Sequence, residues 1–151
     1  MAQGKSDILL LEKVLLLRSV HMFKGTDETV LAQIGEIMEE RFYPAGEEVF
    51  KEGDEGDCMY IIYSGEVRIH KGSHTLTTFK KNDFFGELSL LDADIRSASA
   101  TCVTDSTLFV IHQESFYDII ETQPEVTRAI LHELCKRIRV ADDQLRALSG
   151  Q

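Results

Sequence analysis

The chain is short of basic residues. Its 151 residues include 16 lysines and arginines against 26 aspartates and glutamates, which gives a formal net charge of −10 at pH 7. A surface of this sign offers no broad basic face to the phosphate backbone of DNA or RNA, so the composition argues against nucleic-acid binding. The same charge opposes the approach of a small anion. Any phosphate site must therefore be made locally, by single basic side chains and backbone dipoles.

Cysteine is scarce as well, and long hydrophobic runs are lacking. Cys58, Cys102 and Cys135 are an odd number of thiols in a chain without a secretory signal, which favours free cysteines in a cytoplasmic protein. Their apolar neighbours predict that each is buried. The run ILLLEKVLLL at residues 8–17 contains Glu12 and is too short to span a bilayer. We expect it to form one face of a docking helix, without membrane insertion.

Apolar residues at helical spacing predict helices at both ends of the chain. Four helices are expected, over residues 7–18, 27–40, 114–122 and 125–148. Thr26 is the expected N-cap of the second helix. Pro124 suits the first turn of the fourth, where a missing N–H group does no harm.

Strands are predicted between these helical ends, where short apolar runs are separated by turn residues. Seven are expected, over residues 41–43, 48–51, 59–64, 66–71, 75–80, 98–103 and 107–112. Many short strands at near-regular spacing indicate a mainly β fold with flanking helices: a jelly-roll, or double-stranded β-helix (β-roll). The expected organisation is a helical segment at 1–40, the β-roll at 41–112 and C-terminal helices at 113–151.

One stretch, FFGELSLLDADIRSASAT at residues 84–101, carries the strongest functional signal. Gly86 leads a turn into a short apolar helical segment, whose first backbone N–H groups can bind an anion. Arg96 can grip a phosphate through two parallel hydrogen bonds. The Glu87 carboxylate only accepts hydrogen bonds, so it suits a sugar hydroxyl and would repel the phosphate. Together these residues predict a site for a small sugar phosphate.

Two plainer interpretations compete with a ligand site. Arg96 could be an ordinary surface residue, but it lies between Ile95 and a run of small residues typical of an inward-facing strand. An arginine there is costly to bury without an anionic partner. Glu87 and Arg96 could also form a purely structural salt bridge. Because that bridge would not explain the turn at Gly86, ligand binding is the favoured interpretation.

The same stretch resembles the phosphate-binding cassette of the cyclic-nucleotide-binding domains, the cAMP and cGMP sensors of kinases, channels and bacterial regulators. Upstream, PAGEEVFKEGDEGDCMYIIYSGEVRI at residues 44–69 resembles the first half of the β-roll in those domains. The two glycine-punctuated motifs occur in the right order and at a suitable distance. The resemblance covers roughly residues 20–140.

The resemblance implies roles for individual residues. Glu87 would bond the ribose 2′-hydroxyl and Arg96 the cyclic phosphate, at the cassette that begins with Gly86. Backbone N–H groups of four further residues would complete the cradle: Leu88, Ser89, Ser97 and Ala98. Ile69 would make an apolar contact with the sugar or base. Phe85 is expected to pack beneath the cassette rather than touch the ligand.

The chain departs from the usual pattern of the family at two positions. Ile95 stands before the arginine where proline is frequent, and residues 80–82, Lys-Lys-Asn, stand where a glycine is common. Asparagine tolerates a left-handed backbone, so the turn is expected to persist. Neither change removes a ligand-contacting group. We expect cAMP in preference to cGMP, although Ser97 follows the arginine at a place where a hydroxyl can assist guanine.

Two alternatives to a nucleotide sensor stay open. A β-roll could serve protein–protein contact, with its pocket empty or filled by another phosphate. A metal-dependent cupin-like enzyme would share the architecture but needs clustered imidazoles. Only His70 and His74, on either side of the expected Gly72 turn, are close; three are scattered: His21, His112 and His132. Nothing resembles an activated nucleophile, so no enzymatic activity, metal or cofactor beyond the nucleotide is expected.

The last expected helix is interpreted as a lid. It carries more apolar surface than a free tail should expose, at Ile130, Leu131, Leu134, Ile138, Leu145 and Leu148. We expect the ligand to lie between the cassette and this helix and to draw the helix inward. Without ligand the helix would swing away or pair with another subunit, so a homodimer or an effector partner is expected through the helices. No helix-turn-helix, kinase, channel or cyclase segment is recognised.

Overall fold

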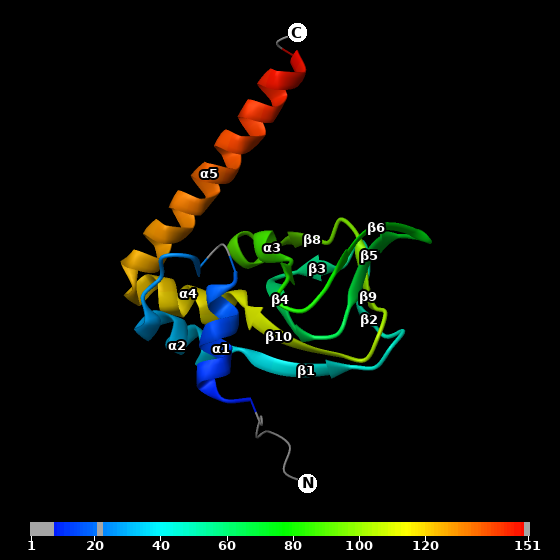
Figure 1. The fold of residues 1–151 in the computed structure, drawn as a ribbon, viewed down its shortest axis with the longest axis horizontal. Coiled ribbons are helices and arrows are strands. Elements are labelled where there is room, and N and C mark those ends of the chain that lie inside the picture. Colours follow the sequence, from blue (N-terminus) through cyan, green and yellow to red (C-terminus); the bar gives the residue numbers. More distant parts are fainter. Residues whose placement is uncertain (1–7, 21–22, 150–151) are drawn as a thin grey trace.

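The computed structural model describes residues 8–20 and 23–149. Figure 1 shows helices α1, α2 and α4 gathered at one end of a β-roll, with α5 projecting away from it as a long rod. The helices are α1 (Leu10–Arg18), α2 (Glu28–Ile37), α3 (Glu87–Leu91), α4 (Gln113–Thr122) and α5 (Pro124–Ser149). The strands are β1 (Glu39–Tyr43), β2 (Glu48–Phe50), β3 (Glu55–Gly56), β4 (Cys58–Ser64), β5 (Val67–Lys71), β6 (His74–Phe79), β7 (Phe84–Phe85), β8 (Asp94–Ile95), β9 (Ser99–Cys102) and β10 (Ser106–His112).

The strands form two four-stranded sheets and one short ribbon. The first sheet has the order β1-β10-β4-β7, the second β2-β9-β5-β6, and β3 pairs with β8. Every pairing is antiparallel, and strands distant in sequence, such as β4 and β10, lie side by side. This arrangement confirms the predicted jelly-roll with flanking helices.

Strand β4 contributes to two apolar clusters, one shared with the helices and one inside the roll. Successive side chains of a strand point to opposite faces, and the first five residues of β4 are all buried. Met59 and Ile61 pack with the helices, whereas Tyr60 and Ile62 pack between the two sheets. A strand covered on both faces reads as a continuous apolar run, as the sequence CMYII does.

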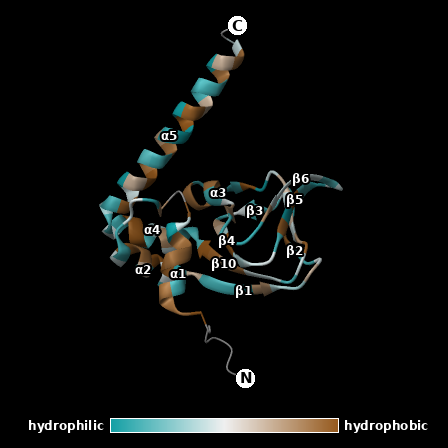
Figure 2. Cartoon of the chain, viewed as in Figure 1, coloured by the Kyte–Doolittle hydropathy of each residue, from teal (hydrophilic) through white to brown (hydrophobic). Residues whose placement is uncertain are grey.

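The helical end of the molecule is held by its own apolar cluster. Side chains of α1, α2 and α4 meet there, including Leu17, Leu31, Ile34 and Phe116, all 0–1% exposed. Figure 2 shows α1 and α2 with hydrophobic colour, whereas the projecting part of α5 is mainly hydrophilic with isolated hydrophobic bands. No helix within residues 8–20 and 23–149 combines the length and the apolar character required to cross a lipid bilayer.

The second helix differs from its prediction at both ends. It begins after Asp27, whose backbone is extended, so Thr26 is not the N-cap; the Thr26 hydroxyl is buried without a hydrogen-bond partner. At its other end the helix stops at Ile37, because Glu39 and Glu40 instead pair with Val110 and Phe109 in the first sheet. Cross-strand hydrogen bonding there outweighs the helical propensity of glutamate.

Three short strands were not predicted, and two burial predictions were wrong. Strands β3, β7 and β8 have two residues each, too few to show a period. Cys58 and Cys102 are buried as expected, but Cys135 is exposed on α5. His70, expected on an exposed turn, is 9% exposed, because its two ring nitrogens bond to the Gly72 carbonyl (2.7 Å) and the Thr101 hydroxyl (2.8 Å).

Candidate functional site

A cavity of about 1050 Å³ opens between the second sheet, the segment around α3 and the first half of α5. The structure brings all eight predicted ligand-binding residues to its wall: Ile69, Gly86, Glu87, Leu88, Ser89, Arg96, Ser97 and Ala98. Leu134 and Arg137 of α5 line the same cavity. We call this cavity the cleft.

Gly86 fixes the entry into α3. Its backbone is left-handed, with φ 78° and ψ 14°, and it directly precedes the helix. A Cβ at this position would lie 2.9 Å from Arg96 Nη1 and 3.2 Å from the Cys58 carbonyl oxygen. Both the conformation and the space therefore require glycine. The Ser89 N–H donates to the Gly86 carbonyl (3.1 Å), so this amide, expected to face the ligand, is already engaged within the turn.

Arg96 is held inside the wall of the cleft and is only 6% exposed. Its Nη1 donates to the Ser89 hydroxyl (3.0 Å) and its Nη2 to the Cys58 carbonyl (2.9 Å). The guanidinium lies 4.3 Å from the centroid of the Phe50 ring, a cation–π contact. These contacts fix the plane and the position of the charged group.

The backbone around Arg96 is equally fixed. Its N–H donates to the Asp54 carbonyl (2.7 Å), and its own carbonyl accepts from the Gly53 N–H (2.9 Å). The adjoining β3–β8 ribbon brings Gly56 against the arginine, where an added Cβ would overlap the Arg96 side chain. The absence of a side chain at Gly56 thus makes the room that the guanidinium occupies.

The buried guanidinium has only neutral hydrogen-bond acceptors. Among the residues that the structure describes, no carboxylate forms an ion pair with Arg96. The salt bridge between Glu87 and Arg96, which the sequence left open as a purely structural alternative, is therefore not formed. A buried cation without an anion is costly, because hydroxyl and carbonyl dipoles replace only part of its hydration. The arrangement leaves the charge available to an anion in the cleft.

Glu87 points its carboxylate towards α5 instead. Its Oε1 lies 3.4 Å from Arg137 Nη1, with the Glu87 side chain 22% exposed and that of Arg137 39% exposed. Pairs this exposed contribute little stability, about 0–1 kcal/mol. The contact nevertheless joins the cassette to the long helix across the cleft.

The opposite wall is apolar. Ile69, Leu76 and Phe79 come from neighbouring strands of the second sheet. Phe85 is 4% exposed and stacks against Tyr60 (5.1 Å between ring centroids) and Phe79 (5.8 Å), and it also lines the cleft. The cleft thus has one charged side and one apolar side.

Several residues that line the cleft or position Arg96 were not predicted from the sequence. Phe79 of β6 could have been found from alternation in a predicted strand next to Ile69. Leu76 lies three residues earlier, on the opposite face of a regular strand, and reaches the same wall where the β5–β6 register shifts. Ser19 and Arg137 carried no signal, because they reach the cleft only through the packing of the terminal helices. Gly56 and Cys58 were equally invisible, since both contact Arg96 across about forty residues of chain.

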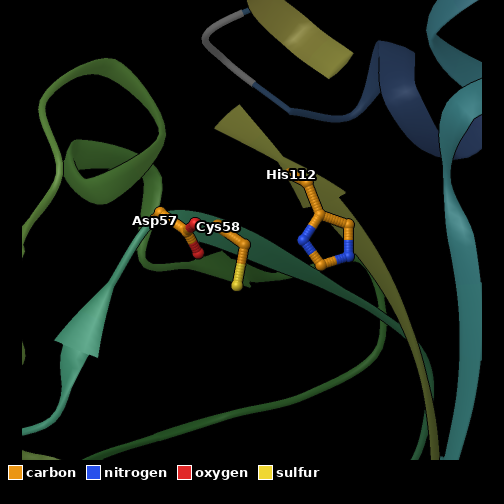
Figure 3. A group of neighbouring side chains, drawn as sticks. All are labelled: Asp57, Cys58 and His112. Atoms are coloured by element: carbon orange, nitrogen blue, oxygen red, sulfur yellow. The ribbon is translucent and has the colours of Figure 1, made fainter. Parts of the chain in front are cut away.

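A second group of polar side chains lies outside the cleft. One carboxylate oxygen of Asp57, the Cys58 Sγ and one ring nitrogen of His112 all lie within 4.8 Å of one another (Figure 3). His112 is scattered from the other histidines in the sequence, and the register of β4 and β10 pairs it with Cys58.

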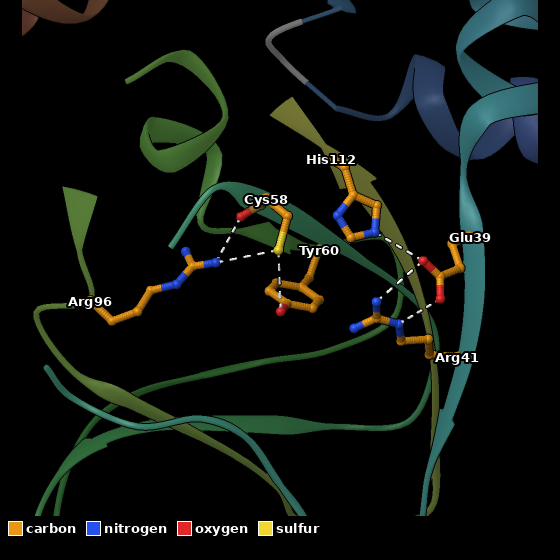
Figure 4. Close-up of polar contacts among 6 residues, drawn as sticks. All are labelled: Glu39, Arg41, Cys58, Tyr60, Arg96 and His112. Carbon is orange, nitrogen blue, oxygen red and sulfur yellow. Dashed lines mark hydrogen bonds and ion pairs between the residues drawn. The ribbon is translucent and has the colours of Figure 1, made fainter. Parts of the chain in front are cut away.

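Cys58 links the two groups. Figure 4 shows Arg96 and His112 approaching it from different sides. Its Sγ lies 3.5 Å from Arg96 Nη2 and donates to the Tyr60 hydroxyl (3.3 Å). His112 Nε2 in turn lies 2.9 Å from Glu39 Oε1. Hydrogen bonds from Arg41 and then from His112 lower the pKa of Glu39 to about 2, so this carboxylate is ionised at neutral pH.

Known proteins share this fold and this motif. The sequence profile described as "Cyclic nucleotide-binding domain" matches residues 40–123. The cyclic AMP receptor protein of Thermus thermophilus is 39% identical over 114 residues, which are 72% of this chain and 53% of that protein. Human cGMP-dependent protein kinase 2 is 30% identical over 119 residues, 74% of this chain and 16% of the kinase. The chain therefore spans about half the length of the Thermus relative.

A solved structure agrees with both sequence matches. The N-terminal domain of a transcriptional regulator from Streptomyces coelicolor A3(2) superposes with a TM-score of 0.81 at 29% identity, covering 85% of this chain and 93% of that one. The profile covers more than half of the chain and includes the whole cassette from Gly86 to Ala98. The chain belongs to the cyclic nucleotide-binding domain family.

Proposed function

We propose that this chain is a regulatory domain that binds cAMP, in preference to cGMP, in the cleft beside α3. The observation that carries the proposal is the Arg96 guanidinium, which is 6% exposed, lines the cleft and has only neutral acceptors among the described residues. An anionic ligand supplies the missing negative charge. A planar guanidinium matches a phosphate with two oxygens free to accept.

The two sides of the cleft orient the nucleotide. The cyclic phosphate binds Arg96 and the adjoining backbone at Ser97 and Ala98. The ribose 2′-hydroxyl donates to Glu87, which gives up its contact with Arg137 or shares the carboxylate between the two. The purine then lies along the apolar wall that includes Ile69. A cavity of about 1050 Å³ is sufficient for a ligand of this size.

The proposed preference for cAMP over cGMP rests on sequence similarity to known proteins, and the side chain of Ser97 limits it. The Thermus relative named as a cyclic AMP receptor is 39% identical, whereas the human kinase named for cGMP is 30% identical. Ser97 is exposed beside the phosphate site, where its hydroxyl can also serve guanine. We therefore expect a preference for cAMP that is a matter of degree and not an exclusion of cGMP.

Helix α5 is the proposed output element. Leu134 and Arg137 line the cleft, but beyond them the helix leaves the body of the domain, as Figure 1 shows. Its large apolar side chains past the cleft are exposed: Ile138 (62%), Val140 (56%), Leu145 (63%) and Leu148 (79%). A purine against Leu134 adds contacts on the inner face of α5. Occupancy would thereby draw the helix towards the cassette. Without ligand the helix would swing away, and its exposed apolar residues would pair with a second subunit or an effector.

Displacement of a fluorescent cyclic nucleotide tests the proposal. We expect cAMP to displace the probe at lower concentration than cGMP, and 5′-AMP, which lacks the cyclic ester, to displace it weakly. A chain that binds none of these nucleotides at millimolar concentration would instead support a β-roll used for protein–protein contact. Tighter binding of cGMP than of cAMP would reverse the proposed preference and leave the site unchanged.

A further inference from the structure

Asp57, Cys58 and His112 come together because of the register of two central strands. Cys58 is the first residue of β4 and His112 the last of β10, and they are direct partners in the antiparallel pair. Partners of this kind project to the same face of a sheet. Asp57 immediately precedes the strand, so its carboxylate is free to turn to that face (Figure 3). None of the three lines the nucleotide cleft.

Glu39 fixes the orientation and the tautomer of the His112 ring. The ring Nε2 lies 2.9 Å from Glu39 Oε1. Because a carboxylate only accepts hydrogen bonds, Nε2 carries the proton. The lone pair of the neutral ring is then on Nδ1, which faces Cys58 in Figure 4. Glu39 is itself anchored by Arg41 Nε (2.9 Å) and Nη2 (3.2 Å), so the ring is supported from behind. Metal-binding histidines are held in this way.

We propose that Asp57 Oδ, Cys58 Sγ and His112 Nδ1 form a Zn²⁺ site, separate from the nucleotide cleft. A thiolate, an imidazole nitrogen and a carboxylate oxygen are ligands that zinc accepts, whereas Mg²⁺ and Ca²⁺ require oxygen ligands. Ligand atoms around tetrahedral zinc lie about 3–4 Å apart. The three atoms lie within 4.8 Å of one another, so metal binding would draw them slightly closer together, and the exposed Asp57 side chain has room to turn towards the ion. Three protein ligands leave a fourth position for water.

Charge and proton balance are compatible with this site. The Cys58 thiol now donates to the Tyr60 hydroxyl. On binding, the S–H proton leaves to solvent and a zinc–sulfur bond replaces the S–H bond. One thiolate and one carboxylate neutralise the two charges of zinc, so the loaded site does not repel the Arg96 guanidinium 3.5 Å from the sulfur. Cys58 thereby becomes a contact shared by the metal site and the arginine of the cleft.

Metal titration of the reduced, metal-free chain tests the site. We expect one equivalent of Zn²⁺ to bind in competition with a chromophoric chelator. Co²⁺ in its place should give a thiolate-to-cobalt charge-transfer band. Cys58→Ser should abolish the band, and His112→Gln should weaken binding at least about tenfold. Glu39→Ala should weaken binding about 10–100-fold but keep the band, because it removes support for a ligand and not a ligand.

Two matched controls guard against adventitious binding. Cys135→Ser removes an exposed thiol and His74→Gln an exposed imidazole, both remote from the proposed site, so each should bind Zn²⁺ like the parent. Loss of the cobalt band in Cys135→Ser, or its absence from the parent, overturns the proposal. Should Cys58→Ser fail to fold, His112→Gln and Asp57→Asn decide, since both side chains lie at the surface. If either variant binds Zn²⁺ as tightly as the parent, the proposed metal site is contradicted, whether or not the chain binds cyclic nucleotides.

Discussion

Arg96 carries the charge on which the proposed nucleotide site depends. Arg96→Lys keeps a positive charge but loses the planar group that bonds Ser89 and the Cys58 carbonyl together. We expect cAMP affinity to fall at least about tenfold, equivalent to about 1.4 kcal/mol. Probe displacement measures this, with Arg139→Lys on the exposed part of α5 as the control. Unchanged affinity in Arg96→Lys would show that the phosphate is held elsewhere.

Gly56 provides a second test of the same guanidinium. Its φ lies outside the left-handed region, so alanine fits the backbone, but the new Cβ would overlap the Arg96 side chain. The arginine must move, so Gly56→Ala should weaken cAMP binding at least about tenfold and should also lower the folding free energy by about 1–3 kcal/mol, because it overpacks a buried group. Gly46→Ala should lower stability without weakening cAMP binding. It strains a residue at φ +89° with open space around it, costing about 1 kcal/mol of folding free energy without touching the site. Equal cAMP affinity in parent and Gly56→Ala would contradict this account.

Glu87 is expected to recognise the ribose. Glu87→Gln should weaken cAMP binding and also reduce discrimination against 2′-deoxy-cAMP, because the variant and the analogue remove the same contact. Glu114→Gln, an exposed position on α4, should change neither value. The decisive measurement is the ratio of the two dissociation constants in each protein. The same ratio in parent and Glu87→Gln would assign Glu87 only to its pair with Arg137.

The contrast between these residues shows what the sequence could reveal about the site. Gly86, Glu87 and Arg96 lie in one contiguous motif, so their spacing alone predicts a phosphate site. Gly56 and Cys58 act on the same arginine from about forty residues away. No local pattern marks such residues, because their role arises from strand pairing between distant segments. The partnership of Cys58 with His112 was hidden for the same reason.

At the scale of elements, the sequence predicts those that have a period or a continuous apolar run. Strand β4, buried on both faces, and the amphipathic helix α4 are examples. The β3–β8 ribbon has two residues in each strand and leaves no pattern, although it positions Arg96. At Glu39 and Glu40 local propensity favours helix, and pairing with β10 overrides it.

Helix α5 is the element for which the proposal predicts a response. With cAMP bound, backbone amides near Leu134 and Arg137 should exchange more slowly, because the purine adds contacts to this face of the helix. Exchange of amides beyond Val140, which lie away from the cleft, should change only if cAMP alters pairing with a second subunit. Hydrogen exchange across residues 126–148 measures both effects. Unchanged exchange despite confirmed binding would place the output in α1 and α2 instead.

At the scale of the whole molecule, the cassette is continuous with the helical core. Leu90 of α3 is fully buried in the cluster that contains Leu17 and Phe116. A ligand on the cassette should therefore stabilise the entire domain in one transition. At about a hundred times its dissociation constant, cAMP should add roughly 2.7 kcal/mol, or on the order of 5–10 °C in melting temperature. Two separate transitions, of which only one shifts, would contradict a single cooperative unit.

Calorimetric titration of the chain with cAMP tests the central claim most directly. The account predicts saturable binding of one cAMP per chain, because each chain has one buried Arg96 lining one cleft. It also predicts that binding is lost in Arg96→Gln, which leaves a shorter, neutral polar side chain and removes the positive charge. Absence of saturable heat in the parent at millimolar cAMP, or full binding in Arg96→Gln, would contradict the account.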